Sequence, residues 1–155
     1  MEKKTIVINY FQSKITELSE EAMNLVLEAQ ESIKTAYSPY SQFSVGSALL
    51  LDNGEYVRGS NQENAAYPSG LCGERVALFA WGANNSENKV VAIAISAKNQ
   101  KGEFAKAYPC GACLQVMVET EIRTKEKLKI IVQINDQEVQ VFNGVECLMP
   151  FSFSL

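Results

Sequence analysis

Val90-Val91-Ala92-Ile93-Ala94-Ile95 is the stretch of this sequence that decides the fold. An apolar run without interruption is typical of a central strand that is covered on both faces. Shorter strand-like runs surround it, and Asp52-Asn53-Gly54 predicts the turn of a hairpin. We expect strands over 43–51, 55–60, 130–134 and 138–142.

Helical patterns alternate with these strands. Ser19 precedes two glutamates, as an N-cap does, and apolar residues recur at spacings of three and four over 21–36. This pattern predicts an amphipathic helix that stops at Ser38-Pro39. Two more helical segments begin near Cys72 and Cys110. The short β-branched run 4–11 predicts an N-terminal strand or extended arm. The order of elements predicts an α/β fold, with helices on the faces of a mixed sheet and residues 1–155 forming a single domain.

The composition of the chain limits which classes of molecule it is expected to bind. The chain has 155 residues, 46% of them hydrophobic, and a net charge of -4. No apolar run approaches the ~18 residues of a membrane span, and Met1-Glu2-Lys3-Lys4 is not followed by a signal-peptide core. We therefore expect a cytoplasmic protein with no membrane partner and with reduced cysteines. The acidic balance predicts no nucleic-acid partner, and the basic run 123–129, interrupted by a glutamate, is interpreted as a solvated connector.

The absence of histidine limits the possible chemistry. A serine-histidine triad is excluded, so acid–base work falls to a carboxylate, a thiol, a lysine, a tyrosine or a metal-activated water. A small, uncharged substrate suits the composition.

Two cysteine motifs carry the strongest functional signal. Cys72-Gly73-Glu74 precedes one helical segment, and Pro109-Cys110-Gly111-Ala112-Cys113 precedes another. Three thiolates, from Cys72, Cys110 and Cys113, predict a Zn2+ site with one open position, which is typical of catalytic zinc, whereas structural sites usually have four protein ligands. A lone C-x-x-C is also found in structural zinc knuckles and redox pairs, and Cys147 is either a fourth ligand or core filler.

Glu74 is the candidate catalytic residue. It lies two residues from Cys72, where a carboxylate that does not bind the metal can move protons between a metal-activated water and the substrate. The pattern C-x-E followed by P-C-x-x-C is the three-cysteine signature of zinc deaminases. Arg75 can donate hydrogen bonds to the thiolates and offset their charge, as can the two helix N-termini.

With these motifs the sequence resembles the small homotetrameric zinc-dependent cytidine deaminases. Residues 36–46 resemble that family's opening motif, 61–67 its ribose-binding strand end, and 148–153 its C-terminal motif. The resemblance implies a three-layer α/β/α sandwich with a mixed five-stranded sheet. It also implies hydrolytic deamination of cytidine and 2'-deoxycytidine to uridine and 2'-deoxyuridine with release of ammonia, a reaction of pyrimidine salvage. The partner is then a pyrimidine nucleoside, and the assembly a homotetramer with active sites shared between subunits.

The resemblance also implies residue roles. Asn61 and Glu63 alternate on one strand face, which allows both to reach ribose hydroxyls. The remaining implied substrate-binding residues are Phe43 as an aromatic wall, the backbone N–H of Gly73, Ala65 and Tyr67 across an interface, and Phe153 from a neighbouring subunit. Gln115 keeps a family position near the metal.

The sequence departs from the family at two positions near the metal motifs. Gly73 stands where alanine is usual, which predicts a more flexible helix start. Leu114 replaces an arginine, which removes a positive charge near the thiolates.

Three rival hypotheses remain open at this stage. One is deamination of a nucleoside antibiotic or a free base, and a second is a non-catalytic zinc module with four cysteine ligands. Nucleic-acid editing is the third, and the acidity of the chain disfavours it.

Overall fold

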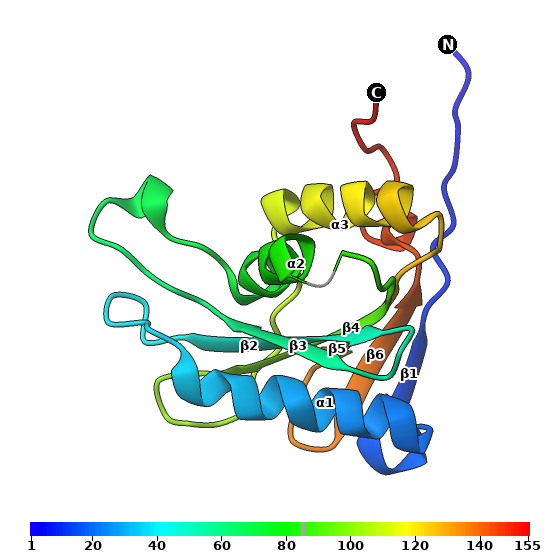
Figure 1. The fold of residues 1–155 in the computed structure, drawn as a ribbon. Helices are drawn as coiled ribbons and strands as arrows, with labels where there is room; N and C mark the ends of the chain where they lie inside the picture. The colour runs from blue at the N-terminus through cyan, green and yellow to red at the C-terminus, as the bar shows by residue number, and fades with distance from the viewer. Residues whose placement is uncertain (85) are drawn as a thin grey trace.

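The protein is built around one six-stranded sheet, described here from a computed structural model that covers residues 1–84 and 86–155 (Figure 1). The strand order is β1-β6-β5-β4-β2-β3. Only β4 and β5 pair in parallel among the described strands, so the sheet is mixed, as predicted. The strands are β1 (Phe11–Lys14), β2 (Ser44–Leu51), β3 (Tyr56–Ser60), β4 (Val90–Lys98), β5 (Lys129–Gln133) and β6 (Glu138–Asn143).

The prediction of five strands was wrong because the N-terminus adds a sixth. The β-branched run 4–11 suggested a strand there, yet the ladder begins only at Phe11, which pairs with Val141, and ends where Lys14 pairs with Glu138. β6 continues to Asn143, where it pairs with β5, but its ladder with β1 stops at the Phe11–Val141 pair, so residues 4–10 form an extended arm. Strand propensity reports how side chains fit a pleated surface, and says nothing of whether a partner edge is present.

Helices cover both faces of the sheet and complete three layers (Figure 1). α1 (Glu20–Ser32) lies on one face, while α2 (Gly73–Asn84) and α3 (Gly111–Thr124) lie together on the other. Ser19 caps α1 by accepting a hydrogen bond from the backbone N–H of Ala22, as predicted. α1 ends at Ser32, earlier than the pattern over 21–36 suggested. The described chain also contains short 3-10 helices: η1 (Ile15–Glu17), η2 (Ile33–Thr35), η3 (Tyr67–Ser69) and η4 (Val145–Cys147).

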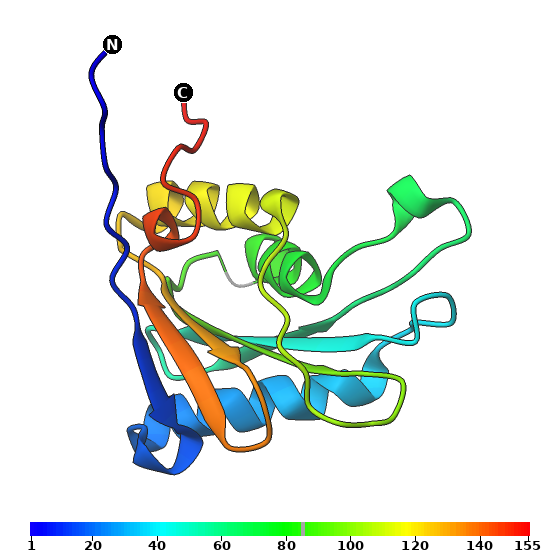
Figure 2. The ribbon, with the colours of Figure 1, turned by 180° about the vertical axis from the view of Figure 1, so that it is seen from behind.

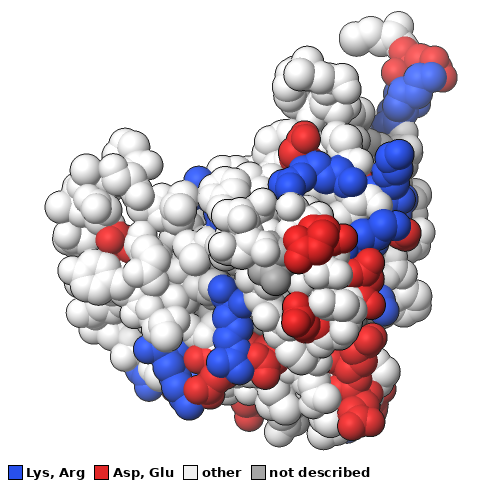
Figure 3. Space-filling model, viewed as in Figure 1, with Lys and Arg blue, Asp and Glu red and all other residues white. Residues whose placement is uncertain are grey.

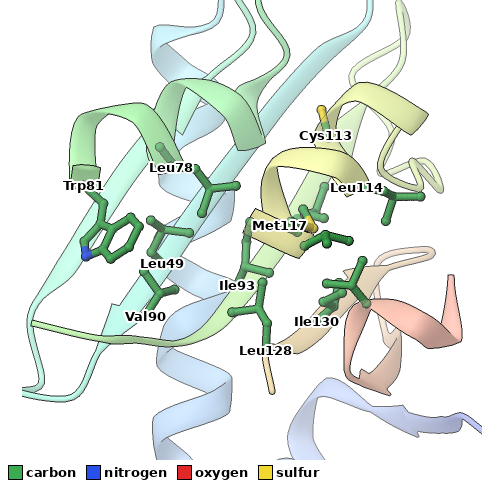
Figure 4. Packing of buried hydrophobic residues seen from close by; sticks show 14 of the residues in the cluster. Leu49, Leu78, Trp81, Val90, Ile93, Cys113, Leu114, Met117, Leu128 and Ile130 are labelled. Atoms are coloured by element: carbon green, nitrogen blue, oxygen red, sulfur yellow. The ribbon is translucent and has the colours of Figure 1, made fainter. Parts of the chain in front are cut away.

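β4 is the central strand that its apolar run predicted. Ile93 and Ile95 are buried in the cluster beneath α2 and α3, and Ala92 and Ala94 belong to a second cluster beneath α1. Figure 4 shows the first cluster, in which Met117 of α3 lies close to Ile93 and Ile130. Both faces of β4 are therefore covered, and the strand lies between the two helical layers.

Two glycines let helices approach the sheet closely. A Cβ at Gly46 would lie 2.1 Å from the carbonyl oxygen of Ala29 in α1, and a Cβ at Gly59 would lie 2.4 Å from the backbone nitrogen of Ala77 in α2. No side chain fits in either place, so these positions set the distance of α1 and α2 from the sheet.

Both termini project from the body of the protein on the side of the sheet that α3 covers (Figures 1 and 2). Among the described residues, no helix is both long enough and apolar enough to cross a membrane.

Candidate metal centre and active site

The three cysteines of the two motifs come together between the starts of α2 and α3. Cys72 immediately precedes α2, Cys110 is the N-cap of α3, and Cys113 lies in the first turn of α3. The Sγ atoms of Cys72 and Cys110 are 3.8 Å apart, and those of Cys110 and Cys113 are 3.5 Å apart. Tetrahedral zinc with Zn–S bonds of about 2.3 Å requires sulfurs separated by about 3.8 Å. The cluster therefore fits zinc.

Positive groups surround this cluster of sulfurs. Arg75 donates from Nη2 to the Cys72 Sγ over 3.7 Å, as the sequence suggested. A hydrogen bond from Cys113, aided by Arg75, lowers the pKa of the Cys72 thiol to about 5, whereas the same contact with Cys72 raises the pKa of the Cys113 thiol. The N-termini of α2 and α3 add partial positive charge. One of the three sulfurs is thus ready to be a thiolate before any metal binds.

Glu74 lies in the first turn of α2, beside the sulfurs but outside the group of three ligands. Its side chain is 4% exposed. Burial raises the pKa of this carboxyl to about 7, and the nearby Cys72 thiolate acts in the same direction. A carboxyl with a pKa near neutrality both accepts and donates protons readily at physiological pH.

A cavity of about 510 Å³ opens beside Cys72 and Arg75. Asn61, Glu63 and Tyr67, which the sequence predicted as substrate-binding residues, line it. Other residues that line it are Tyr40, Ser41, Gln62, Asn64, Gly70 and Leu71. One sulfur of the cluster, that of Cys72, therefore lies in the same cavity as three of the predicted substrate-binding residues.

Asn61 and Glu63 also hold the walls of this cavity in place. The Asn61 side chain accepts a hydrogen bond from Val45 N–H over 2.8 Å and donates one to the Phe43 carbonyl over 2.9 Å. Glu63 accepts from the backbone N–H groups of Tyr40, at 2.9 Å, and Ser41, at 3.2 Å. Hydrogen bonding, with the Ser41 hydroxyl first, lowers the pKa of Glu63. Both side chains are thus fixed in orientation at the edge of the cavity.

Charge is scarce around the mouth of the site. Residues 36–51 contain no charged side chain, and within 59–73 the only one is Glu63. The projecting loops at the left of Figure 3 are accordingly almost entirely white.

Several predicted residues do not line this cavity in the described structure. They are the buried Glu74, the ligands Cys110 and Cys113, and the predicted substrate-binding residues Phe43, Ala65, Gly73 and Phe153. Phe43 is half-buried next to the cavity wall, whereas Ala65 and Phe153 are exposed. Gln115 donates a hydrogen bond to the Phe153 carbonyl over 2.9 Å, which ties the C-terminal segment to α3. The substrate roles of these residues stay predictions.

The residues that depart from the family pattern have structural explanations. A Cβ at Gly73 would lie 3.1 Å from the Val45 carbonyl oxygen, so this helix start is tightly packed against the sheet. Leu114 is 8% exposed and belongs to the apolar cluster against which Cys147 and Leu148 pack. The Cys147 Sγ donates to the Asn143 carbonyl, and this cysteine lies outside the three-sulfur cluster. Core filler is therefore the better reading of Cys147.

Sequence reasoning missed Tyr40 as a residue that lines the cavity. Its ring meets the ring of Tyr67 edge to face, with centroids 6.1 Å apart, at the mouth of the site. Its place inside the opening motif was the available signal, but the pairing depends on how two distant loops meet.

Comparison with known proteins agrees with this geometry. Residues 18–126 match the profile described as "Cytidine and deoxycytidylate deaminase zinc-binding region". A cytidine deaminase of Halalkalibacterium halodurans is 45% identical over 95 residues, which cover 61% of this chain and 68% of the relative. A cytidine deaminase of Sporosarcina psychrophila is 38% identical over 95 residues, which cover 61% of this chain and 66% of the relative.

The fold agrees as well. The solved structure of cytidine deaminase from Burkholderia pseudomallei superposes with a TM-score of 0.72 at 34% identity, covering 88% of this chain and 100% of that one. The profile spans well over half of the chain, and it includes all three sulfur ligands and Glu74. This chain belongs to the zinc-binding family of cytidine and deoxycytidylate deaminases.

Proposed function

We propose that this protein is a zinc-dependent cytidine deaminase, which hydrolyses cytidine or 2'-deoxycytidine to the corresponding uridine and ammonia. The observation that carries the proposal is a buried carboxyl, Glu74, beside three converging sulfurs that adjoin a cavity of about 510 Å³. Membership of the family supports it. Pyrimidine salvage in the cytoplasm is the setting that we propose.

The chemistry divides between the metal and the protein. Cys72, Cys110 and Cys113 would hold the zinc, which would supply an activated water at neutral pH. Glu74 accepts a proton from the attacking water and delivers it to the ring nitrogen next to the amino-bearing carbon. The same carboxylate then carries a second proton to the amino group, so that ammonia leaves. Its pKa of about 7 suits both directions of transfer.

The cavity favours a nucleoside over a nucleotide. Arg75 is the only cationic residue lining the cavity in the described structure, and it faces the Cys72 sulfur. A 5'-phosphate would therefore meet the Glu63 carboxylate without a free cation nearby. We assign Asn61 and Glu63 to the ribose hydroxyls, Phe43 to the pyrimidine face and the Gly73 N–H to the pyrimidine carbonyl.

The homotetramer with shared active sites is also part of the proposal. The stretch 64–69, which carries Ala65 and Tyr67, is exposed on a loop that stands away from the body (Figure 2). Phe151 and Phe153 are 84% and 68% exposed. Exposed aromatic residues of this kind are typical of interfaces. A neighbouring subunit that supplies Phe153 accounts for both features.

A Glu74→Gln variant tests the catalytic role. We expect turnover of cytidine, followed by ultraviolet absorbance, to fall by roughly 10²-fold or more while one zinc per chain is retained. Glu20→Gln is the matched control, because Glu20 occupies the first turn of α1 as Glu74 does in α2, and it should leave turnover unchanged. Full activity of Glu74→Gln would remove this residue from the mechanism. Deoxycytidine, cytosine and cytidine monophosphate in the same assay define the substrate.

Mixing two inactive variants tests the shared site. Glu74→Gln and Phe153→Ala subunits, unfolded and refolded together, should regain activity above that of either alone, because some sites then combine an intact Glu74 with an intact Phe153. Activity that never exceeds that of the separate variants would contradict sharing.

A further inference from the structure

The N-terminal arm, defined as residues 2–9, continues the edge strand β1 into solvent without a partner. β1 is the outermost strand of the sheet. Within the described chain, none of the backbone groups of 3–9 makes a hydrogen bond to other backbone. The arm runs alongside the body and then past it, as both ribbon views show (Figures 1 and 2). An extended segment with free N–H and C=O groups is a template for pairing with another strand.

The side chains of this arm suit a strand better than a free tail. Ile6, Val7 and Ile8 form a run of β-branched residues that are 49%, 76% and 45% exposed. Tyr10, at the base of the arm, stacks on Phe142 of β6 with ring centroids 5.4 Å apart, which anchors it to the sheet. The arm is thus held at one end and presents unburied apolar side chains along the rest of its length. A solvent-exposed run of this kind is typical of an interface.

We propose that the arm is a dimerisation strand, which pairs antiparallel with the arm and β1 of a second copy of this chain around a two-fold axis. An isologous interface requires a self-complementary segment. When Ile8 faces Ile8 of the second copy, Glu2 falls opposite Lys14, so two opposite-charge pairs form by symmetry. In this register Ile6 faces Tyr10, and no two like charges are directly opposite.

Charge selects this register over its neighbours. A shift by one residue in one direction places Lys3 opposite Lys14, and a shift by two in that direction places Lys4 opposite Lys14. A shift by one in the other direction moves Glu2 away from Lys14 to face Ser13, so both opposite-charge pairs are lost. Like charges directly opposite each other destabilise a strand pair. Glu2 and Lys14 are both exposed, so each is available to a second copy. Within one chain Glu2 contacts only the neighbouring Lys4 among the described ion pairs, over 3.1 Å.

The arm lies apart from the active site, so assembly and catalysis can be measured separately. Deleting residues 2–9 leaves β1 and its pairing with β6 in place. We expect this deletion to halve the molar mass measured by light scattering, while zinc content per chain persists. If the intact protein is a tetramer, the arm pairing lies on one of its two-fold axes and the deletion leaves dimers. An unchanged mass after deletion overturns the proposal.

A charge exchange tests the register itself. Lys14→Glu sets two glutamates opposite each other across the interface, and we expect the dissociation constant of the arm-dependent assembly to rise about tenfold. It also places a glutamate opposite Glu138 of β6 within the chain, a change that the double variant shares, so recovery in the double variant reports the pairing between arms. The double variant Glu2→Lys with Lys14→Glu should restore it. Lys3→Glu is the matched control, because it makes the same change of net charge opposite Ser13 and should have little effect. A Lys14→Glu variant that assembles as tightly as the original chain, or a double variant that does not recover, overturns the pairing.

Discussion

Gly59→Ala perturbs the contact that positions α2, and with it the metal centre. The added Cβ would lie 2.4 Å from the backbone nitrogen of Ala77 and 2.5 Å from the carbonyl oxygen of Gly73. Because ordinary contacts are about 3.5 Å, α2 has to move away from β3 by about 1 Å. Both obstructing atoms are backbone, so no side-chain rotation relieves the clash. Overpacking of this kind costs about 3 kcal/mol.

The displacement also reaches the chemistry, because Cys72 and Glu74 stand at the start of α2. Their separation from Cys110 and Cys113 on α3 has to change with the helix. A misplacement of about 1 Å costs on the order of 10²-fold in rate. We therefore expect both the free energy of unfolding, from denaturant titration, and kcat/KM for cytidine to fall together.

Gly82→Ala is the matched control on the same helix. There the added Cβ meets only the end of the Arg123 side chain, at 3.2 Å, which is free to move. Replacing a helical glycine with alanine should leave activity intact and raise stability by up to about 1 kcal/mol. If the free energy of unfolding of Gly59→Ala lies within about 0.5 kcal/mol of that of the original protein and the variant keeps full activity, close packing does not position α2.

Three further outcomes follow from the site and the fold. Chelation should abolish turnover and lower the free energy of unfolding by about 3 kcal/mol, given zinc at 100 times its dissociation constant. Cys113→Ser should lose zinc and Cys147→Ser should keep it, as measured by mass spectrometry of the native protein. In the metal-free protein, native Glu74 keeps its proton to about pH 7 whereas the unfolded residue loses it near 4.5, so this carboxyl lowers the free energy of unfolding by about 3 kcal/mol as pH rises across this window. The lowered pKa of the Cys72 thiol acts in the opposite direction over part of the window, so the Glu74 effect is measured as the difference from Glu74→Gln, and identical pH profiles of the two proteins would refute this account. Ser19→Ala removes the cap of α1 and should cost about 1 kcal/mol by denaturant titration, and no loss would mean that the cap is not needed.

Local pattern was enough to predict most of the elements. The apolar run at Val90–Ile95 identified the central strand because a strand covered on both faces has no polar positions. The cap at Ser19 and the hairpin turn at 52–54 rest on interactions between near neighbours in the chain, so they too can be predicted from sequence. For the run 4–11 the sequence left a strand and an extended arm open; only Phe11–Lys14 is a strand, because strand pairing depends on a partner edge that is remote in sequence.

The sequence by itself determined which groups can hold a metal and carry protons, and the spacing of these thiolates and this carboxylate indicated a zinc deaminase. Only the tertiary structure decided how the parts are joined. It places Asn61 and Glu63 in the same cavity wall as Cys72, and it brings the Cys72 sulfur within 3.8 Å of that of Cys110, 38 residues further along the chain. It also raises the pKa of Glu74 by burial, which arises only when the chain folds around the carboxyl. Spacing along a chain specifies which chemical groups are present, whereas distances and desolvation arise only when remote segments pack together.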